Sequence, residues 1–182
     1  MIWSWLKRSS RPFLMSPEFL KTRRFLQQVW FFDRVPRREF GQLYHCLVRR
    51  RYEAGEHLVE EGQVGYALFI IESGCAEVYR QLGDGQLDRL AVLSAGDCFG
   101  EMALLHEQPR SATVTAIEPT YAYLLYKTKL EELVDHSPHI AAAILMRLSH
   151  HLAIRLEQTL RPKSELYSNT ALEESPHVIG LR

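Results

Sequence analysis

The 182-residue sequence contains few cysteines, no long apolar run and no excess of either charge. The three cysteines, Cys46, Cys75 and Cys98, have no CxxC spacing, which argues against a disulfide framework or a zinc ribbon and fits a reducing cytoplasm. The longest apolar runs, such as 66–71, are far shorter than a bilayer requires, and the first residues lack the apolar core of a secretory signal. We therefore expect a cytoplasmic globular protein without a transmembrane segment.

The zero net charge hides an uneven distribution of charge along the chain. Residues 1–51 hold 12 Lys plus Arg and 3 Asp plus Glu, a net charge of +9, and residues 52–182 hold the remaining 10 and 19, a net charge of −9. A basic region suits an anionic partner such as a membrane surface or nucleic acid, although solvated helix faces are the commoner reason for such charges. The sequence leaves both interpretations open.

The first 30 residues are expected to form an arm and a helix ahead of the main domain. Residues 1–15 mix Trp, Leu and Phe with Lys and Arg, as do peptides at membrane interfaces and arms that pack on their own domain. Ser16, followed by Pro17 and Glu18, predicts a helix start with a hydroxyl cap, a first-turn proline and an acid near the positive helix end. That helix is predicted to run to about residue 32, and a second one from Pro36 to about residue 47.

Residues 48–126 have the pattern of a β protein. Glycine and proline turn signals recur, and the segments between them have the length of strands and are rich in Val, Ile, Tyr and Thr. The predicted strands are 66–72, 76–81, 87–93, 111–117 and 121–126. Regular short strands with glycine turns are typical of a sandwich, roll or barrel.

The sequence after residue 126 is predicted to be helical. Thr128 and Glu131 have the spacing of a capping box. Ser137 and Pro138 predict the start of a longer helix, whose apolar pattern persists to Leu160. A proline follows two residues later, and residues 161–182 are interpreted as a C-terminal tail.

One segment in the β region carries residues suited to ligand chemistry. Gly100 permits close backbone approach, and good helix formers follow it, so a single helical turn is expected there. The free N–H groups at the start of such a turn attract an anion, most naturally a phosphate. Arg110 can pair with that phosphate, and Ser111 adds a hydroxyl donor. An ionised Glu101 only accepts hydrogen bonds and so suits a ribose hydroxyl. A phosphate site and a ribose acceptor in one segment together describe a site for a nucleotide with few charges.

Taken singly, Glu101 is a favourable acid in a first helical turn and Arg110 an exposed ion-pairing residue. Together with their neighbours they closely resemble the phosphate-binding cassette of the cyclic nucleotide-binding domain family. The matching stretches are Phe99-Gly100-Glu101-Met102-Ala103-Leu104 and Pro109-Arg110-Ser111-Ala112-Thr113-Val114. Further similar segments follow the family order at 60–62, 69–74, 93–97 and 144–149, so the resemblance covers about residues 30–160.

The resemblance implies an α+β fold: an antiparallel, jelly-roll-like β-roll with flanking N-terminal helices and a long C-terminal helix. The domain would span residues 31–160, including its C-terminal helices. The ligand would be cAMP or cGMP, with no other cofactor, no metal and no catalytic residue. Glu101 and the Gly100 backbone would hold the ribose 2′-hydroxyl. The cyclic phosphate would be held by Arg110, Ser111 and the backbone of Met102, Ala103 and Ala112. The positions that match the base pocket are Val78, Leu90, Leu93 and Thr159.

Over 144–159 the predicted long helix is similar to the dimerisation helix of bacterial catabolite activator proteins. In those proteins a threonine that matches Thr159 contacts adenine. The residue after that threonine is serine there and Leu160 here. On this similarity we expect cAMP rather than cGMP, because Ser111 does not distinguish them. An apolar stripe through Leu145, Leu148 and Leu152, which Arg155 interrupts, predicts either a homodimer seam within 137–160 or packing of the helix on its own β-roll. Only 22 residues follow Leu160, so sequence-specific DNA binding is not expected.

The sequence predicts a receptor rather than an enzyme. It contains no nucleophile motif, P-loop or HExxH, and the adjacent His150 and His151 would point about 100° apart on a helix, which does not suit one metal ion. We expect a stand-alone cyclic nucleotide receptor that changes shape on binding and signals to an unidentified protein partner. Two alternatives are open: a β-roll scaffold that no longer binds nucleotide, and a regulator associated with a membrane or nucleic acid through its basic N-terminal region.

Overall fold

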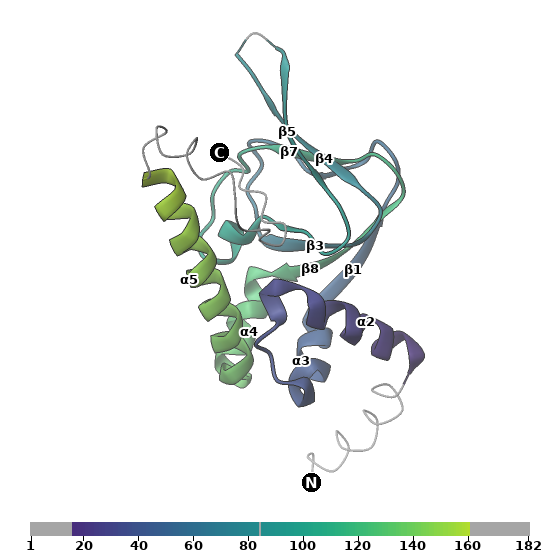
Figure 1. Cartoon of the computed structure of the whole chain (residues 1–182), viewed down its shortest axis with the longest axis vertical. Helices are drawn as coiled ribbons and strands as arrows, with labels where there is room; N and C mark the ends of the chain where they lie inside the picture. Colours follow the sequence, from purple (N-terminus) through teal and green to yellow (C-terminus); the bar gives the residue numbers. More distant parts are fainter. Residues whose placement is uncertain (1–15, 84, 161–182) are drawn as a thin grey trace, which may run out of the picture.

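The computed structural model of the chain describes residues 16–83 and 85–160, which form a β-roll of two antiparallel sheets flanked by helices (Figure 1). One sheet has the strand order β1 (Leu47–Tyr52), β8 (Thr120–Tyr126), β3 (Ala67–Ser73), β6 (Cys98–Phe99). The other has the order β2 (His57–Val59), β7 (Thr113–Ala116), β4 (Ala76–Gln81), β5 (Leu87–Leu93). The predicted α+β class and antiparallel roll are confirmed.

All five predicted strands are present, β4 and β5 with the predicted bounds and the others with ends shifted by one or two residues. The sequence analysis did not name β1, β2 and β6. Strand β6 has only two residues and β2 only three, too few to show a period. Strand β1 is an edge strand that carries three consecutive exposed arginines, so it lacks the apolar alternation that reveals the other strands.

The central strands β3 and β8 separate two hydrophobic cores. Leu68 and Ile70 of β3 face the helices, whereas Phe69 and Ile71 face the inside of the roll. Because side chains alternate along a strand, a strand buried on both faces is an apolar run, which is the pattern of β3. The sheet that contains the cassette strand β6 is therefore packed on both sides.

The N-terminal helices are shorter than predicted. Ser16 caps α2 (Pro17–Gln28) as expected, since its hydroxyl oxygen accepts a hydrogen bond from the Phe19 N–H at 3.1 Å. The helix ends four residues before the predicted boundary, because Val29 is extended, and a short turn, η2 (Trp30–Phe32), follows. The predicted second helix divides into η3 (Arg37–Glu39) and α3 (Phe40–His45), after which β1 begins.

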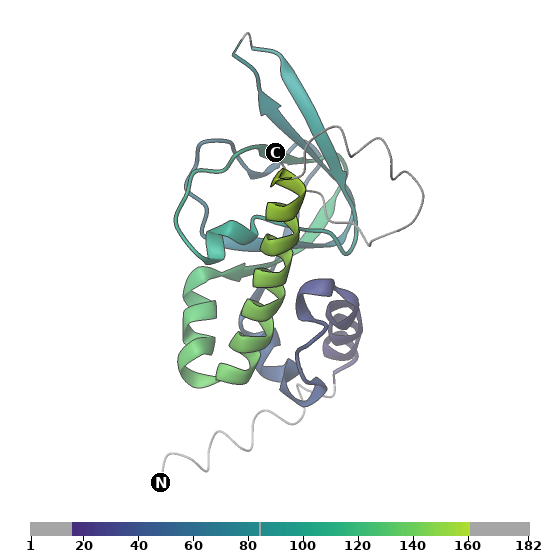
Figure 2. The same ribbon diagram turned by 60° about the vertical axis from the view of Figure 1, so that its left-hand side comes forward.

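The C-terminal helices are α4 (Lys127–His136) and α5 (Pro138–Leu160), and the bounds of α5 agree with the prediction. The predicted capping box is wrong, because α4 begins before Thr128, Tyr126 takes the cap position and no side chain caps the helix. Figure 2 shows α5 rising from between α4 and the N-terminal helices along the side of the roll. The long helix thus contacts both the helical layer and the cassette.

The predicted arm at 1–15 and the predicted tail at 161–182 lie outside the described residues. Within the described ranges, no helix is both long and apolar enough to cross a membrane.

Gly74, between β3 and β4, offers a test of the fold. Its φ is +87°, and a Cβ there would lie 2.6 Å from the Pro119 carbonyl oxygen and 2.7 Å from Thr120 Cα. Because backbone atoms cannot move aside easily, we expect Gly74→Ala to lower the free energy of unfolding by about 3 kcal/mol or more in urea denaturation. Gly55, with φ +84° and open space, is the control, and Gly55→Ala is expected to cost only about 1–2 kcal/mol. Equal losses in the two variants would contradict the close approach at Gly74.

Candidate functional site

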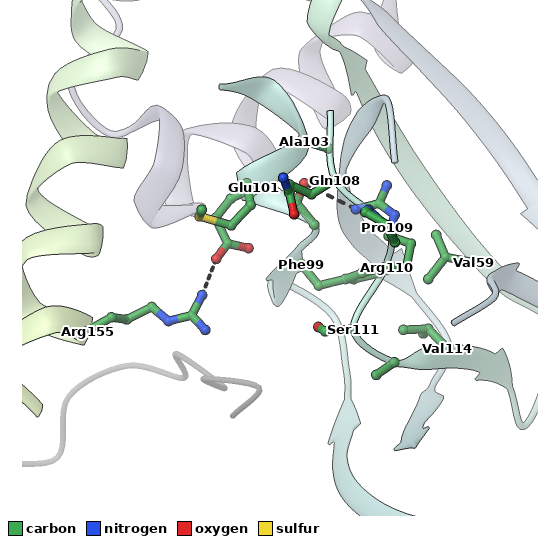
Figure 3. Close-up of a pocket in the computed structure, with 13 residues that line it drawn as sticks. Val59, Phe99, Glu101, Ala103, Gln108, Pro109, Arg110, Ser111, Val114 and Arg155 are labelled. Atoms are coloured by element: carbon green, nitrogen blue, oxygen red, sulfur yellow. Dashed lines mark hydrogen bonds and ion pairs between the residues drawn. The ribbon is translucent and has the colours of Figure 1, made fainter. Parts of the chain in front are cut away.

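A cavity of about 110 Å³ lies where β6 leads into the short turn η4 (Glu101–Leu104) (Figure 3). Its lining comprises Val59, Phe99, Gly100, Glu101, Met102, Ala103, Gln108, Pro109, Arg110, Ser111, Ala112, Val114 and Arg155. The structure therefore brings together at one cavity all seven residues that the sequence assigned to ribose and phosphate. Five further lining residues come from the roll and the cassette loop, and the last, Arg155, comes from α5.

The predicted helical turn after β6 is present as the 3₁₀ turn η4. Gly100 precedes it with φ +78°, a left-handed conformation that favours glycine. The Phe99 ring stacks on Phe69 with centroids 4.8 Å apart, which fixes the end of β6 against β3. The turn thereby starts at a fixed place, with Ala103 N–H bonded to the Gly100 carbonyl at 3.2 Å.

Arg110 occupies a narrow slot between two glycines. A Cβ on Gly65 would lie 2.6 Å from Arg110 Cζ, and one on Gly100 would lie 2.3 Å from its Nη1. The guanidinium donates hydrogen bonds to the carbonyls of Ala67 at 2.8 Å and Gly100 at 3.3 Å, and it lies 5.6 Å from the centre of the Phe69 ring. No carboxylate among the described residues forms an ion pair with it.

Burial lowers the pKa of Arg110, and the nearby charge of Glu101 acts in the opposite direction. An arginine stays protonated under any physiological condition. The cavity therefore presents a half-buried cation whose hydrogen bonds go to backbone carbonyls, which suits an anion such as a phosphate.

Glu101 is buried, with 11% of its side chain exposed, and it is directed toward α5 (Figure 3). Its Oε1 accepts a hydrogen bond from Arg155 Nη1, and His151 Nε2 lies 3.8 Å from the same oxygen. Burial acts to raise the pKa of this carboxyl, but His151, the residue's own backbone N–H and the charge of Arg155 outweigh it, so the pKa is lowered. The cavity thus holds an ionised carboxylate, a hydrogen-bond acceptor as the sequence predicted.

The sequence analysis missed Arg155 and His151 as parts of this site. It treated Arg155 as an interruption of an apolar stripe and His151 as half of an adjacent histidine pair. The signal in the sequence is their spacing, because residues four apart lie on one face of a helix. Nothing in the sequence indicated that this face meets Glu101.

The four residues predicted for the base pocket do not line the cavity. Val78 and Leu93 are fully buried within the roll, and Leu90 is half-buried against the same core. Thr159 is exposed on α5, where its hydroxyl donates to the Arg155 carbonyl at 2.9 Å. Val78 pairs with the lining residue Val114, so it lies one strand away from the cavity. The base pocket stays a prediction.

No group of three or more His, Cys, Asp and Glu side chains able to hold a metal ion occurs in the part of the chain that the structure describes.

The sequence and the fold match those of known proteins. The family model described as "Cyclic nucleotide-binding domain" matches residues 49–137, which include most of β1, the strands β2 to β8, the cassette and all of α4. This part of the chain therefore belongs to the cyclic nucleotide-binding domain family, a family of regulatory, non-catalytic domains.

Two curated relatives and one solved structure illustrate the similarity. A cGMP-dependent protein kinase of Eimeria tenella is 34% identical over 127 residues, which are 70% of this chain and 12% of the kinase. A cyclic AMP receptor protein of Thermus thermophilus is 35% identical over 113 residues, 62% of this chain and 49% of that protein. The crystal structure of the Thermus thermophilus catabolite activator protein superposes with a TM-score of 0.64 at 31% identity, covering 76% of this chain and 62% of that one. The chain thus spans half or less of the length of these two curated relatives.

The slot around Arg110 offers a test of the site. Because the atoms that a Cβ on Gly65 would meet belong to the end of the Arg110 side chain, Gly65→Ala should fold and displace the guanidinium. We expect affinity for cAMP, measured by calorimetric titration, to fall at least tenfold, about the contribution of one charge-assisted hydrogen bond. Gly83→Ala is the control, since a Cβ at Gly83 would meet open space. Unchanged affinity in Gly65→Ala would show that Arg110 does not need this slot.

Proposed function

We propose that this chain is a receptor domain for a cyclic nucleotide, cAMP in preference to cGMP, which signals to a protein partner through a ligand-induced shift of its C-terminal helix. The observation that carries the proposal is that one cavity holds both Arg110, a half-buried cation that forms no ion pair with a carboxylate of residues 16–83 or 85–160, and Glu101, a buried ionised acceptor. A cyclic nucleotide offers complementary groups, a singly charged phosphate and a ribose hydroxyl.

In the proposed complex, Arg110 binds the cyclic phosphate together with the Ser111 hydroxyl and the backbone of Met102, Ala103 and Ala112. Both side chains line the cavity, and Ser111 is exposed to an incoming ligand. Glu101 accepts a hydrogen bond from the ribose 2′-hydroxyl beside Gly100. The alternative of a scaffold without ligand leaves the half-buried charge of Arg110 unexplained.

Signalling follows from the ion pair that joins the cavity to α5. The ribose hydroxyl would compete with Arg155 for the Glu101 carboxylate. The carboxylate therefore accepts a hydrogen bond either from the ligand or from the helix. Arg147, two turns earlier on α5, donates to the Trp30 carbonyl at 2.9 Å and pairs with Asp33. A movement of α5 thus reaches the N-terminal helices. The ligand shifts the population from one helix position to the other by an extent that depends on the difference in its affinity for the two positions.

The preference for cAMP is supported by the similarity of the long helix to catabolite activator proteins. The names of the relatives include both cyclic nucleotides, and the cassette serine does not separate them. In this proposal the base lies on the side of the roll that carries Val78, Leu90 and Leu93, and Thr159 approaches it once α5 has moved.

The proposal includes a homodimer formed through residues 137–160. Ile144 and Leu148 of the predicted stripe are buried in the chain's own core, so this part of the stripe packs on its own domain. A second face of α5 is exposed: Met146, Ala153 and Leu160 recur every seven residues. Exposed apolar side chains of this kind suit a contact with a second copy of the chain.

We place this receptor in the cytoplasm, which fits three cysteines that are all free. The partner is a protein, and sequence-specific DNA recognition and catalysis are not part of the proposed role.

The phosphate contact is tested by Arg110→Ala. We expect cAMP affinity in calorimetric titration to weaken by about 2–3 kcal/mol, because a charged partner of a partly buried phosphate is lost. The control is Arg89→Ala, which removes an exposed arginine paired with Glu77 on the hairpin. Wild-type protein that binds neither cAMP nor cGMP would contradict the proposed function, and unchanged affinity in Arg110→Ala would contradict the pose.

The ribose contact is tested by Glu101→Ala with cAMP and its 2′-deoxy analogue. Wild-type protein should prefer cAMP by about tenfold, as expected for one hydrogen bond to a charged acceptor, and the variant should bind both ligands equally. Titrations of both ligands against both proteins measure this. A variant that keeps the wild-type preference for cAMP would rule out the ribose contact.

A further inference from the structure

His151 is a buried histidine enclosed between the ligand cavity and the N-terminal helices. Only 7% of its side chain is exposed. Its Nε2 lies 3.8 Å from Glu101 Oε1, and its ring lies against Trp30 of η2 with centroids 4.8 Å apart and planes inclined by 37°. The imidazole therefore touches the proposed ribose acceptor on one side and an aromatic ring of the helical layer on another.

Trp30 is itself held in place from α5. The Arg147 guanidinium donates to the Trp30 carbonyl at 2.9 Å, lies 5.8 Å from the Trp30 ring centre and pairs with Asp33 at 2.9 Å. Since Arg147, His151 and Arg155 are spaced by four residues, they lie along one face of α5. This face makes a continuous set of contacts from Asp33 to Glu101.

The two α5 side chains that approach Glu101 differ in how firmly they are placed. Arg155 is long and 28% exposed, and in the proposed mechanism the ribose hydroxyl competes with it. The imidazole has two torsions, is enclosed on the Trp30 side and has little exposed surface, so it stays beside the carboxylate when the ribose hydroxyl displaces the Arg155 side chain, before α5 itself shifts. His151 Nε2 lies 3.8 Å from Glu101 Oε1, which is too far for a direct hydrogen bond. The imidazole therefore limits where the carboxylate can lie and leaves its oxygens able to accept a hydrogen bond from the ligand.

We infer that His151 is a positioning residue for nucleotide binding, which holds the Glu101 carboxylate toward the ribose and so sets the discrimination for the 2′-hydroxyl. The inference rests on the proposed function and deepens it. His151 acts through Glu101 and does not touch the phosphate contact at Arg110.

The experiment measures the dissociation constants of cAMP and 2′-deoxy-cAMP by calorimetry for wild-type protein, His151→Ala and His151→Gln. We expect the preference for cAMP to fall about fivefold in His151→Ala, with the affinity for the 2′-deoxy analogue little changed, because only the ribose contact is weakened. His151→Gln, which keeps a side-chain N–H and much of the volume, should retain most of the preference. The matched control is His150→Ala, whose side chain is exposed on the neighbouring position of α5 and should retain the wild-type preference.

A double-mutant cycle separates positioning from a general structural role. With Glu101→Ala in place, adding His151→Ala should leave the ratio of the two affinities unchanged, because the group through which His151 acts is gone. An equal loss of affinity for both ligands in His151→Ala, or an unchanged ratio, would overturn the inference while leaving the proposed function intact. If the wild-type protein binds no cyclic nucleotide, the proposed function and the inference both fail.

Discussion

The charge on the buried Glu101 carboxylate is the constraint on which the rest of the site depends. Removing an ionised carboxylate from water costs several kcal/mol unless positive charge and hydrogen bonds replace its hydration. Arg155 supplies a charge and a hydrogen bond and His151 lies beside the same oxygen, and both belong to α5, so the helix must lie against η4 for the carboxylate to stay buried and charged. The position of α5 is thereby coupled to whatever Glu101 binds.

The two ends of the cavity differ in their freedom to move. Arg110 is bonded to the Ala67 carbonyl and packs on Phe69, and both residues belong to β3, a strand buried on both faces between the two cores. Interiors of this density resist deformation, so the Arg110 end is fixed. Glu101, by contrast, is held by side chains of a helix whose last turns carry exposed apolar residues, so the acceptor end is the one that changes with the position of α5.

The sequence predicted the fold wherever a local pattern was long enough. Strands β3, β4, β5, β7 and β8 and helix α5 followed from periodicity and turn residues, and the Ser16 cap followed from local chemistry. Strand β1 escaped because its exposed arginines lack alternation, and the Thr128 capping box was wrong because the chain turns into α4 directly from β8. A cap motif is a weak signal where a strand already determines how the chain enters the helix.

The chemistry of the cassette was determined by the sequence alone, because the residues from Gly100 to Ala112 that line the cavity are close along the chain, and the turn η4 and the loop after it suffice to bring them together. The partners of Glu101 were decided only by the tertiary structure. Arg155 lies 54 residues further along the chain, and only the packing of α5 against both the roll and Trp30 selects the helix face that meets the carboxylate. Helical periodicity defines which residues share a face, but the side chains on all the other elements determine what that face touches.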